Sequence, residues 1–230
     1  MLCAHQVWAC GDGGYLAHTD AASMEWVVDA SPVDSTLRAI VVLSPTEMWA
    51  CGDAGTMLNG NGQIWVEWPV PVSSEIDLFA LAALARDQVW AVGDRGAVLF
   101  FDGASWKALQ PLNTARSLRG VSWYFGDDYL GYPPLGVVVG DSGTIFMSND
   151  PTGGGSWSAV DHSLSSATLH SVTAPSNVDA WAVGEGGLLL HFDGEAWVSV
   201  HSGTDADLYV IEAYRSRGIL AAGAGGTILW

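Results

Sequence analysis

Acidic side chains recur along this sequence directly after a glycine, in phrases of the form G-D-x-G or a close variant. Carboxylates repeated in this way could attract a cation or a basic partner. The simpler interpretation, which we favour, is that each carboxylate bonds the backbone of its own tight turn. If the repeats surround a central axis, the tips of these turns lie well away from it, so one ion could not contact all of the carboxylates. The acids are Asp12, Asp53, Asp94, Asp141 and Glu185, and Ala224 takes the sixth position.

A second group of residues that could bind a ligand lies in the segment 123–135 (WYFGDDYLGYPPL), which mixes aromatic rings with carboxylates. Exposed rings beside carboxylates suit stacking on sugars or gripping a peptide. Irregular loops on a rigid scaffold often carry function. The alternative is a loop whose side chains pack on one another and cover the mouth of a channel along the axis of the fold. The ligand-binding candidates in this segment, our first choice of site, are Trp123, Tyr124, Phe125, Asp127, Asp128, Tyr129 and Tyr132.

A third group follows the leucine that opens one strand of each repeat. Its members differ in chemical type from repeat to repeat, whereas the packing positions do not. Varied residues at symmetric positions are what an asymmetric ligand pocket requires, and the alternative is simple filling of a central channel. These further ligand-binding candidates are Arg38, Phe79, Arg119, His170 and Tyr209.

Histidines and cysteines give little support for catalysis or metal binding. The six histidines form neither an HxH nor an HExxH pattern, and the chain has no GxSxG elbow. His18 and His191 share a repeat position with residues of several other types, which predicts a surface position that tolerates many side chains. Cys10 and Cys51 share a position with valines, which predicts a small apolar core site. We therefore predict no catalytic residue, no metal ligand and no cofactor.

An internal repeat positions all of these side chains. One phrase returns six times, and the steps between its first glycines are 41, 41, 47, 44 and 39 residues. Such a period is the mark of a repeat architecture. We call these the marker glycines: Gly11, Gly52, Gly93, Gly140, Gly184 and Gly223.

Each repeat is predicted to form four short strands. The first opens with the leucine, the second is a WAVG-like run, the third follows the G-D-x-G turn, and the fourth carries a tryptophan after a D-G turn. Glycine and aspartate favour such turns, and strands joined in this way form an antiparallel meander. The predicted first strands are 37–43, 78–84, 118–124, 169–174 and 208–214.

A four-stranded sheet of this size cannot bury both faces alone, but sheets arranged radially cover one another. We therefore predict an all-β fold, a β-propeller of four-stranded antiparallel blades in a single domain, residues 1–230. Six blades with incomplete terminal blades are favoured, while five blades or a piece of a larger ring are alternatives. Nine tryptophans are predicted to pack between or along blades: Trp8, Trp26, Trp49, Trp65, Trp90, Trp106, Trp157, Trp181 and Trp197.

Charge and composition narrow the partners. The net charge of −17 arises from 25 acids and 8 bases, and nucleic-acid binding needs clustered Lys and Arg. No apolar run approaches the length that spans a bilayer. The N-terminus lacks the basic and apolar regions of a signal peptide, so the chain either stays in the cytosol or is a mature or trimmed segment. We expect a monomer or part of a longer chain, without nucleic acid or membrane insertion.

The unit W-A-V-G-D-x-G-x-[ILV]-L-x-F-D-G-x-x-W resembles the WAVG-type repeats of bacterial propellers, and residues 90–106 and 181–197 carry it best. These repeats are similar to the BNR or Asp-box class and to photosystem II assembly-factor-like propellers, and residues 148–157 (SNDPTGGGSW) resemble an Asp-box turn with an insertion. The resemblance implies an extracellular or cell-surface setting and a binding or assembly role. Two features of these relatives are missing here, namely an arginine-rich patch and the FRIP-like arginine motif of sialidases.

Three functions remain open at this point. A non-enzymatic binding scaffold for a protein or carbohydrate is the leading hypothesis, since one scaffold hosts many activities. A lectin with one sugar site per blade would repeat a polar and aromatic set that is scarcely visible here. A glycosidase-like enzyme would need two carboxylates about 5–10 Å apart, a pairing that sequence does not show.

Overall fold

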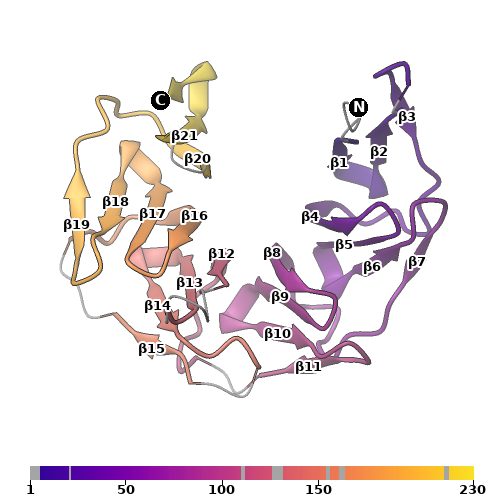
Figure 1. Cartoon of the computed structure of the whole chain (residues 1–230), viewed down its shortest axis with the longest axis horizontal. Helices are drawn as coiled ribbons and strands as arrows, with labels where there is room; N and C mark the ends of the chain where they lie inside the picture. Colours follow the sequence, from indigo (N-terminus) through magenta and orange to yellow (C-terminus); the bar gives the residue numbers. More distant parts are fainter. Residues whose placement is uncertain are drawn as a thin grey trace. The chain divides into compact units, whose positions relative to one another are not determined.

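A computed structural model describes residues 6–20, 22–109, 112–125, 132–153, 156–160, 164–214 and 218–230. The fold is an all-β propeller of six antiparallel blades (Figure 1). Over the described residues, the first and sixth sheets have three strands and the other four have four. The predicted fold class and the preference for six blades with incomplete terminal ones are confirmed. The chain divides into two compact units, residues 1–91 with 99–108 and residues 92–98 with 109–230.

The first three sheets follow one another along the chain. Each sheet is a meander in which sequence neighbours pair. Contacts of β4 with β1 and β8 place the second sheet between the other two. The strands are β1 (Trp8–Cys10), β2 (Leu16–Thr19), β3 (Trp26–Val28), β4 (Leu37–Ser44), β5 (Glu47–Gly52), β6 (Met57–Gly60), β7 (Trp65–Glu67), β8 (Leu78–Ala85), β9 (Gln88–Gly93), β10 (Val98–Phe101) and β11 (Trp106–Ala108).

The last three sheets repeat the same plan. Their first strands β12, β16 and β20 are neighbours in that order (Figure 1). A backbone N–H of each later strand donates to a serine of the preceding one, Ala174 to Ser122 and Ile211 to Ser171. The strands are β12 (Leu118–Tyr124), β13 (Leu135–Gly140), β14 (Ile145–Ser148), β15 (Ser158–Ala159), β16 (Leu169–Ser176), β17 (Asp179–Gly184), β18 (Leu189–Phe192), β19 (Trp197–Val200), β20 (Leu208–Tyr214), β21 (Gly218–Gly223) and β22 (Ile228–Leu229).

A tight 3-10 turn follows each marker glycine, as the G-D-x-G phrases predict. Its second residue has a positive φ, for example Ala54 at 57°. The backbone closes the turn, because the N–H of Thr56 donates to the carbonyl of Asp53 at 3.1 Å. The turns are η1 (Asp12–Gly14), η2 (Asp53–Gly55), η3 (Asp94–Gly96), η4 (Asp141–Gly143), η5 (Glu185–Gly187) and η6 (Ala224–Gly226).

The core lies between neighbouring sheets, which confirms the packing role of the repeat. Each cluster of buried apolar residues joins second- and third-strand residues of one sheet to residues of the next sheet, including residues of its first strand. The leucines that open the first strands are almost fully buried: Leu37, Leu78, Leu118, Leu169 and Leu208.

Most of the predicted packing tryptophans are buried, but not all. Trp49 and Trp90 are each 1% exposed. Trp65, Trp106 and Trp197 are also buried, whereas Trp8, Trp157 and Trp181 are half-buried. For Trp26 the prediction of a packed indole is wrong, since 55% of it is exposed. It stands in β3 of the first sheet, and no described sheet precedes that one along the chain to cover it.

Both described cysteines are free thiols, as their shared position with valine predicts. Cys51 is fully buried in the cluster that contains Trp49, and Cys10 is half-buried. Burial raises the pKa of Cys10 to about 11 and that of Cys51 further, so both thiols stay protonated near neutral pH. In the part of the chain that the structure describes, no helix has the length and apolar character needed to cross a bilayer.

Candidate functional site

The aromatic segment after β12 divides into a buried part and an exposed part. Trp123 lies in β12 directly opposite Gly136 of β13, and its ring occupies the space where a side chain at Gly136 would lie. Its ring also packs edge-on against Trp157 at 5.3 Å. Trp123 is therefore a core residue, which corrects its predicted place on an exposed binding loop.

The rest of this segment is only partly accessible to a ligand. Tyr124 is half-buried against the core between the fourth and fifth sheets. Phe125 and Tyr132 are 60% and 49% exposed. The remaining predicted members, Asp127, Asp128 and Tyr129, lie outside the described residues. Two exposed rings thus mark the ends of this segment.

In the first unit, the position after the opening leucine gathers a cation, a ring and a carboxylate. The guanidinium of Arg38 lies over the ring of Phe79 at 5.4 Å. The same guanidinium forms an ion pair with Asp53 of η2, which raises the pKa of Arg38. Residues from two neighbouring first strands therefore meet. We call Arg38, Asp53 and Phe79 first-strand cluster 1.

In the second unit, the same position brings together three more of the predicted residues. Arg119 forms an ion pair with Asp141 of η4. The rings of His170 and Tyr209 lie 5.6 Å apart on the neighbouring strands β16 and β20, and Tyr209 is 54% exposed. A cation, an imidazole and a phenol thus stand on three adjacent first strands. We call Arg119, Asp141, His170 and Tyr209 first-strand cluster 2.

The acids after the marker glycines tie the turns to the first strands. Besides Asp53 and Asp141, Asp94 accepts a hydrogen bond from the Ser117 hydroxyl at 2.7 Å. Glu185 accepts one from the backbone N–H of Thr168 at 2.9 Å. For these four carboxylates the predicted closure of their own turns is wrong, because the backbone closes each turn. The signal that could have found these contacts is the register of the hairpin between the first and second strands. This register places the marker glycine opposite the opening leucine, as in the pair Leu37 and Gly52.

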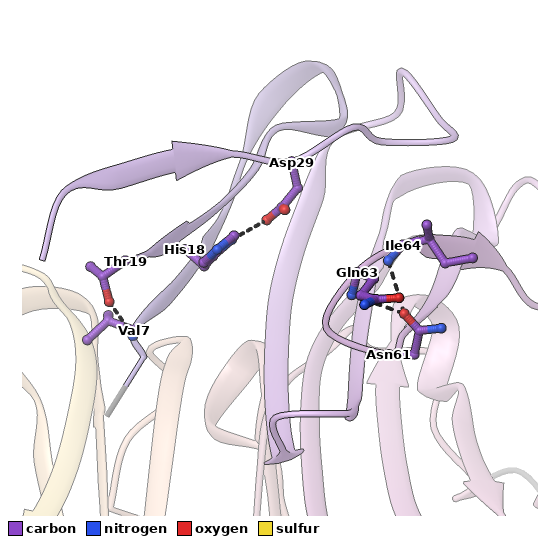
Figure 2. A network of polar contacts seen from close by, with 7 residues as sticks. All are labelled: Val7, His18, Thr19, Asp29, Asn61, Gln63 and Ile64. Carbon is purple, nitrogen blue, oxygen red and sulfur yellow. Dashed lines mark hydrogen bonds and ion pairs between the residues drawn. The ribbon is translucent and has the colours of Figure 1, made fainter. Parts of the chain in front are cut away.

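His18 and His191 are structural residues instead of members of a tolerant surface. His18 stacks on Trp8 at 4.7 Å, and its Nδ1 lies 2.9 Å from a carboxylate oxygen of Asp29 (Figure 2). His191 stacks on Trp181 at 3.9 Å and bonds Asp179 through Nε2 at 2.9 Å. In both sheets the imidazole covers one side of the second-strand indole.

Two grooves of the second unit recur at equivalent places beside η4 and η5. Their volumes are about 590 and 530 Å³. Glycines, serines and threonines of the turns and of the links between sheets form much of their walls, and Phe146 is the one Phe, Tyr or Trp among the described lining residues. Sugar sites commonly offer an aromatic platform, so these grooves do not supply the repeated set that a lectin with one site per blade would need.

The described residues contain no group of three or more His, Cys, Asp or Glu placed to hold a metal ion. Burial raises the pKa of Glu212 in β20, but a glycosidase needs a second carboxylate paired with such an acid. The first-strand clusters suit recognition by charge, hydrogen bonds and rings.

No protein family model and no curated protein sequence matches the chain, so the WAVG and BNR parts of the resemblance have no support from that side. Solved structures do match. YCF48 from Cyanidioschyzon merolae has a TM-score of 0.72 at 18% identity, over 97% of this chain and 76% of that one. A structure of YCF48 bound to D1 peptide has a TM-score of 0.69 at 18% identity, over 98% and 73% of the two chains. At this identity the likeness shows a shared propeller fold.

Proposed function

We propose that this chain is a non-enzymatic scaffold that recognises an extended segment of a protein partner through its first-strand clusters. One observation carries the proposal. The position after the opening leucine is where chemical type changes from blade to blade, and its side chains meet one another and stay partly accessible. The packing positions on either side are buried and apolar.

The chemistry of these clusters fits a peptide backbone. A guanidinium has five N–H donors, so an arginine that is paired with one carboxylate keeps donors for main-chain carbonyls. Arg38 also presents a fixed geometry, because Asp53 and the ring of Phe79 hold it in place. The phenol of Tyr209 offers an apolar ring and a hydroxyl with little conformational entropy to lose. First-strand cluster 1 thus supplies a preorganised guanidinium beside a ring, and first-strand cluster 2 supplies a phenol and an imidazole.

The comparison with known structures supports a protein ligand. A propeller of the same fold has been solved with a peptide bound, YCF48 with D1 peptide. The chain's charge of −17 favours a segment with basic residues, since complementary charge speeds encounter and disfavours acidic competitors. The extracellular or cell-surface setting implied by the sequence resemblance stays a prediction.

A carbohydrate ligand is the second candidate, and the exposed rings of Phe125 and Tyr132 favour it. Those rings lie at the two ends of segment 126–131 and belong to neither first-strand cluster. The two candidates therefore predict losses at different residues.

A peptide array and a glycan array, both probed with the purified chain, test the proposal. We expect basic peptides to be enriched, with affinity falling about tenfold or more in an Arg119→Ala, Tyr209→Ala double variant, since an interface anchor commonly contributes over 1 kcal/mol. Tyr15→Ala, which changes an exposed tyrosine of the first unit outside both clusters, is the matched control and should bind like the parent.

Two results would count against a peptide scaffold. One is the absence of any enriched peptide. The other is peptide binding that survives the double variant and an Arg38→Ala, Phe79→Ala double variant alike. Glycan hits that disappear in Tyr132→Ala but persist in both cluster variants would move the function to the carbohydrate candidate.

A further inference from the structure

A cavity of about 650 Å³ lies between the second and third sheets, beside the hairpins that join β4 to β5 and β8 to β9. Small-molecule sites in proteins have volumes of about 300–1,000 Å³, so the size is suitable. Three aromatic residues line the cavity, namely Trp49, Trp68 and Phe101. This aromatic wall distinguishes the cavity from the two grooves beside η4 and η5.

The first change that opens this place is at the position of His18. In the first sheet, His18 stacks on Trp8 and bonds Asp29, so an imidazole stands beside the second-strand indole (Figure 2). The second sheet has Asn59 at the same repeat position. Its shorter side chain lines the cavity, and its amide donates to the carbonyl of Met48 at 3.2 Å. The space that an imidazole takes in the first sheet is therefore left open beside Asn59.

The second change supplies an indole. A main-chain bond to the third strand places Trp68 where Asp29 stands in the first sheet. Trp68 packs edge-on against Trp49 at 5.4 Å and against Phe101 at 6.0 Å, yet it is only half-buried. Its ring is thus held from two sides and partly open to the cavity. The other described residues at this position are not aromatic: Asp29, Leu109, Val160 and Val200.

The charged groups of the cavity wall are of both signs. The half-buried Glu47 forms an ion pair with the exposed Arg86 of the third sheet, and Asp87 adds a second carboxylate. Because Glu47 is already paired, the cavity has little need of a further cation. Two carboxylates beside one guanidinium disfavour an anion. The wall therefore suits a neutral ligand that both donates hydrogen bonds to carboxylates and accepts them from a guanidinium.

We propose that this cavity is a carbohydrate-binding site, in which a neutral pyranose stacks on the ring of Trp68 and hydrogen-bonds with the ion pair of Glu47 and Arg86. A sugar ring has a face of C–H groups bordered by hydroxyls, which matches an indole bordered by donors and acceptors. One such site is expected, since no other described sheet has an aromatic residue at the position of Trp68. The site shares no residue with the first-strand clusters or the segment 123–135, and it does not rest on their proposed role.

Saturation-transfer difference NMR of the complete 230-residue chain tests the site. The probes are the methyl glycosides of glucose, galactose, mannose and N-acetylglucosamine, each titrated separately. We expect saturable binding of at least one of them. Trp68→Ala should weaken that binding by about tenfold or more, because a ring at the centre of a binding site commonly dominates its affinity. Trp68→Phe keeps an aromatic platform and should retain most of the binding.

Variants at position 59 test whether the open space is needed. Asn59→His restores the side chain that fills this place in the first sheet, so it should weaken the glycoside by about tenfold or more while the fold stays intact. Asn59→Ala leaves the space open and is the matched control, which should bind within about twofold of the parent. Trp26→Ala removes an exposed indole of the first sheet and should also bind like the parent. Circular dichroism verifies that the sheets of each variant are intact.

The proposal is overturned if none of the four glycosides binds, or if binding is unchanged in a folded Trp68→Ala or Asn59→His variant. Binding of arginine amide in place of the glycosides, with loss in Trp68→Ala, would assign the cavity to a basic side chain and refute the carbohydrate. Glycoside binding that Tyr132→Ala removes and Trp68→Ala leaves intact would place the sugar on segment 123–135 instead. Peptide binding by the first-strand clusters is measured separately, so failure of one site leaves the other standing.

Discussion

Trp49 and Trp181 occupy the same position of the repeat, yet they stand in different environments. Trp49 is 1% exposed, enclosed by Phe101 and Trp106 of the next sheet and by Trp68. Trp181 is half-buried, with His191 stacked on one side of its ring, and it lines a cavity that it shares with residues of the three-stranded sixth sheet. The repeat thus fixes which residue stands at the position. The neighbouring sheet decides whether that residue is core or surface.

The two tryptophans should differ most in stability. We expect Trp49→Ala to lower the free energy of unfolding by about 3–5 kcal/mol, the usual cost of removing a buried tryptophan. Trp181→Ala should cost less than about 2 kcal/mol, since part of its surface is already in contact with solvent or an open cavity. Urea denaturation followed by circular dichroism measures both. Equal losses would show that the two environments are alike.

A smaller contrast of the same kind separates two marker glycines. A Cβ at Gly52 would lie 2.0 Å from the carbonyl oxygen of Thr36, whereas at Gly11 its closest neighbour would be Tyr15 at 4.0 Å. The first sheet has no described first strand to press against Gly11. Both glycines have extended backbones, so alanine fits each locally.

Gly52→Ala should therefore cost about 1–3 kcal/mol or more through overpacking, and Gly11→Ala should stay within about 0.5 kcal/mol of the parent. Thermal unfolding of the two variants is the measurement. A large loss for Gly11→Ala would mean that a first strand packs against this turn as well.

The smallest effect concerns the D-G turns that lead into β11 and β19. Asp102 accepts backbone bonds from Ala104 and Ser105 and pairs with Lys107, which lowers its pKa mainly through the lysine. Two hydrogen bonds from the backbone N–H groups of Ala196 and Glu195 lower the pKa of Asp193. A carboxyl whose folded pKa is depressed stabilises the fold above its ordinary pKa, and this contribution is lost as the pH falls through the folded value.

Asp102→Ala and Asp193→Ala should each lower Tm slightly at pH 7, and the difference from the parent should shrink as the pH falls towards 2. The Asp102→Ala loss should be the larger and should shrink in high salt, because an exposed ion pair is screened. Tm values at pH 7 and pH 2, in low and high salt, decide this. A salt-dependent loss at Asp193 would contradict the assignment.

Most of the fold follows from the sequence. The predicted first strand 118–124 is β12, and 37–43 falls one residue short of β4. Such accuracy is expected where apolar pattern, turn residues and repeat spacing agree. Glycine and aspartate at the turns leave the backbone few alternative conformations. The six meanders are therefore predictable from the sequence without knowledge of how they pack.

The sites were harder to predict, since they depend on which strands meet. Trp123 looked like a loop residue until the register set it over Gly136. A glycine opposite an indole, as at Gly60 and Trp65, is the signal that would have found it. The exposure of Trp26 and Trp181 depends on strands that the repeat alone does not supply. The first-strand position was predicted from its variation, and the structure adds its pairings of cation, ring and carboxylate.

The contrast between the two second-strand tryptophans is tested most directly by ¹⁹F NMR of the chain labelled with 5-fluorotryptophan. Trp49→Phe and Trp181→Phe assign the two resonances, and spectra are then recorded in H2O and in D2O. The Trp181 resonance should show the larger solvent isotope shift, because Trp181 is half-buried while Trp49 is 1% exposed. Equal solvent isotope shifts of the two resonances would contradict the difference between the two environments.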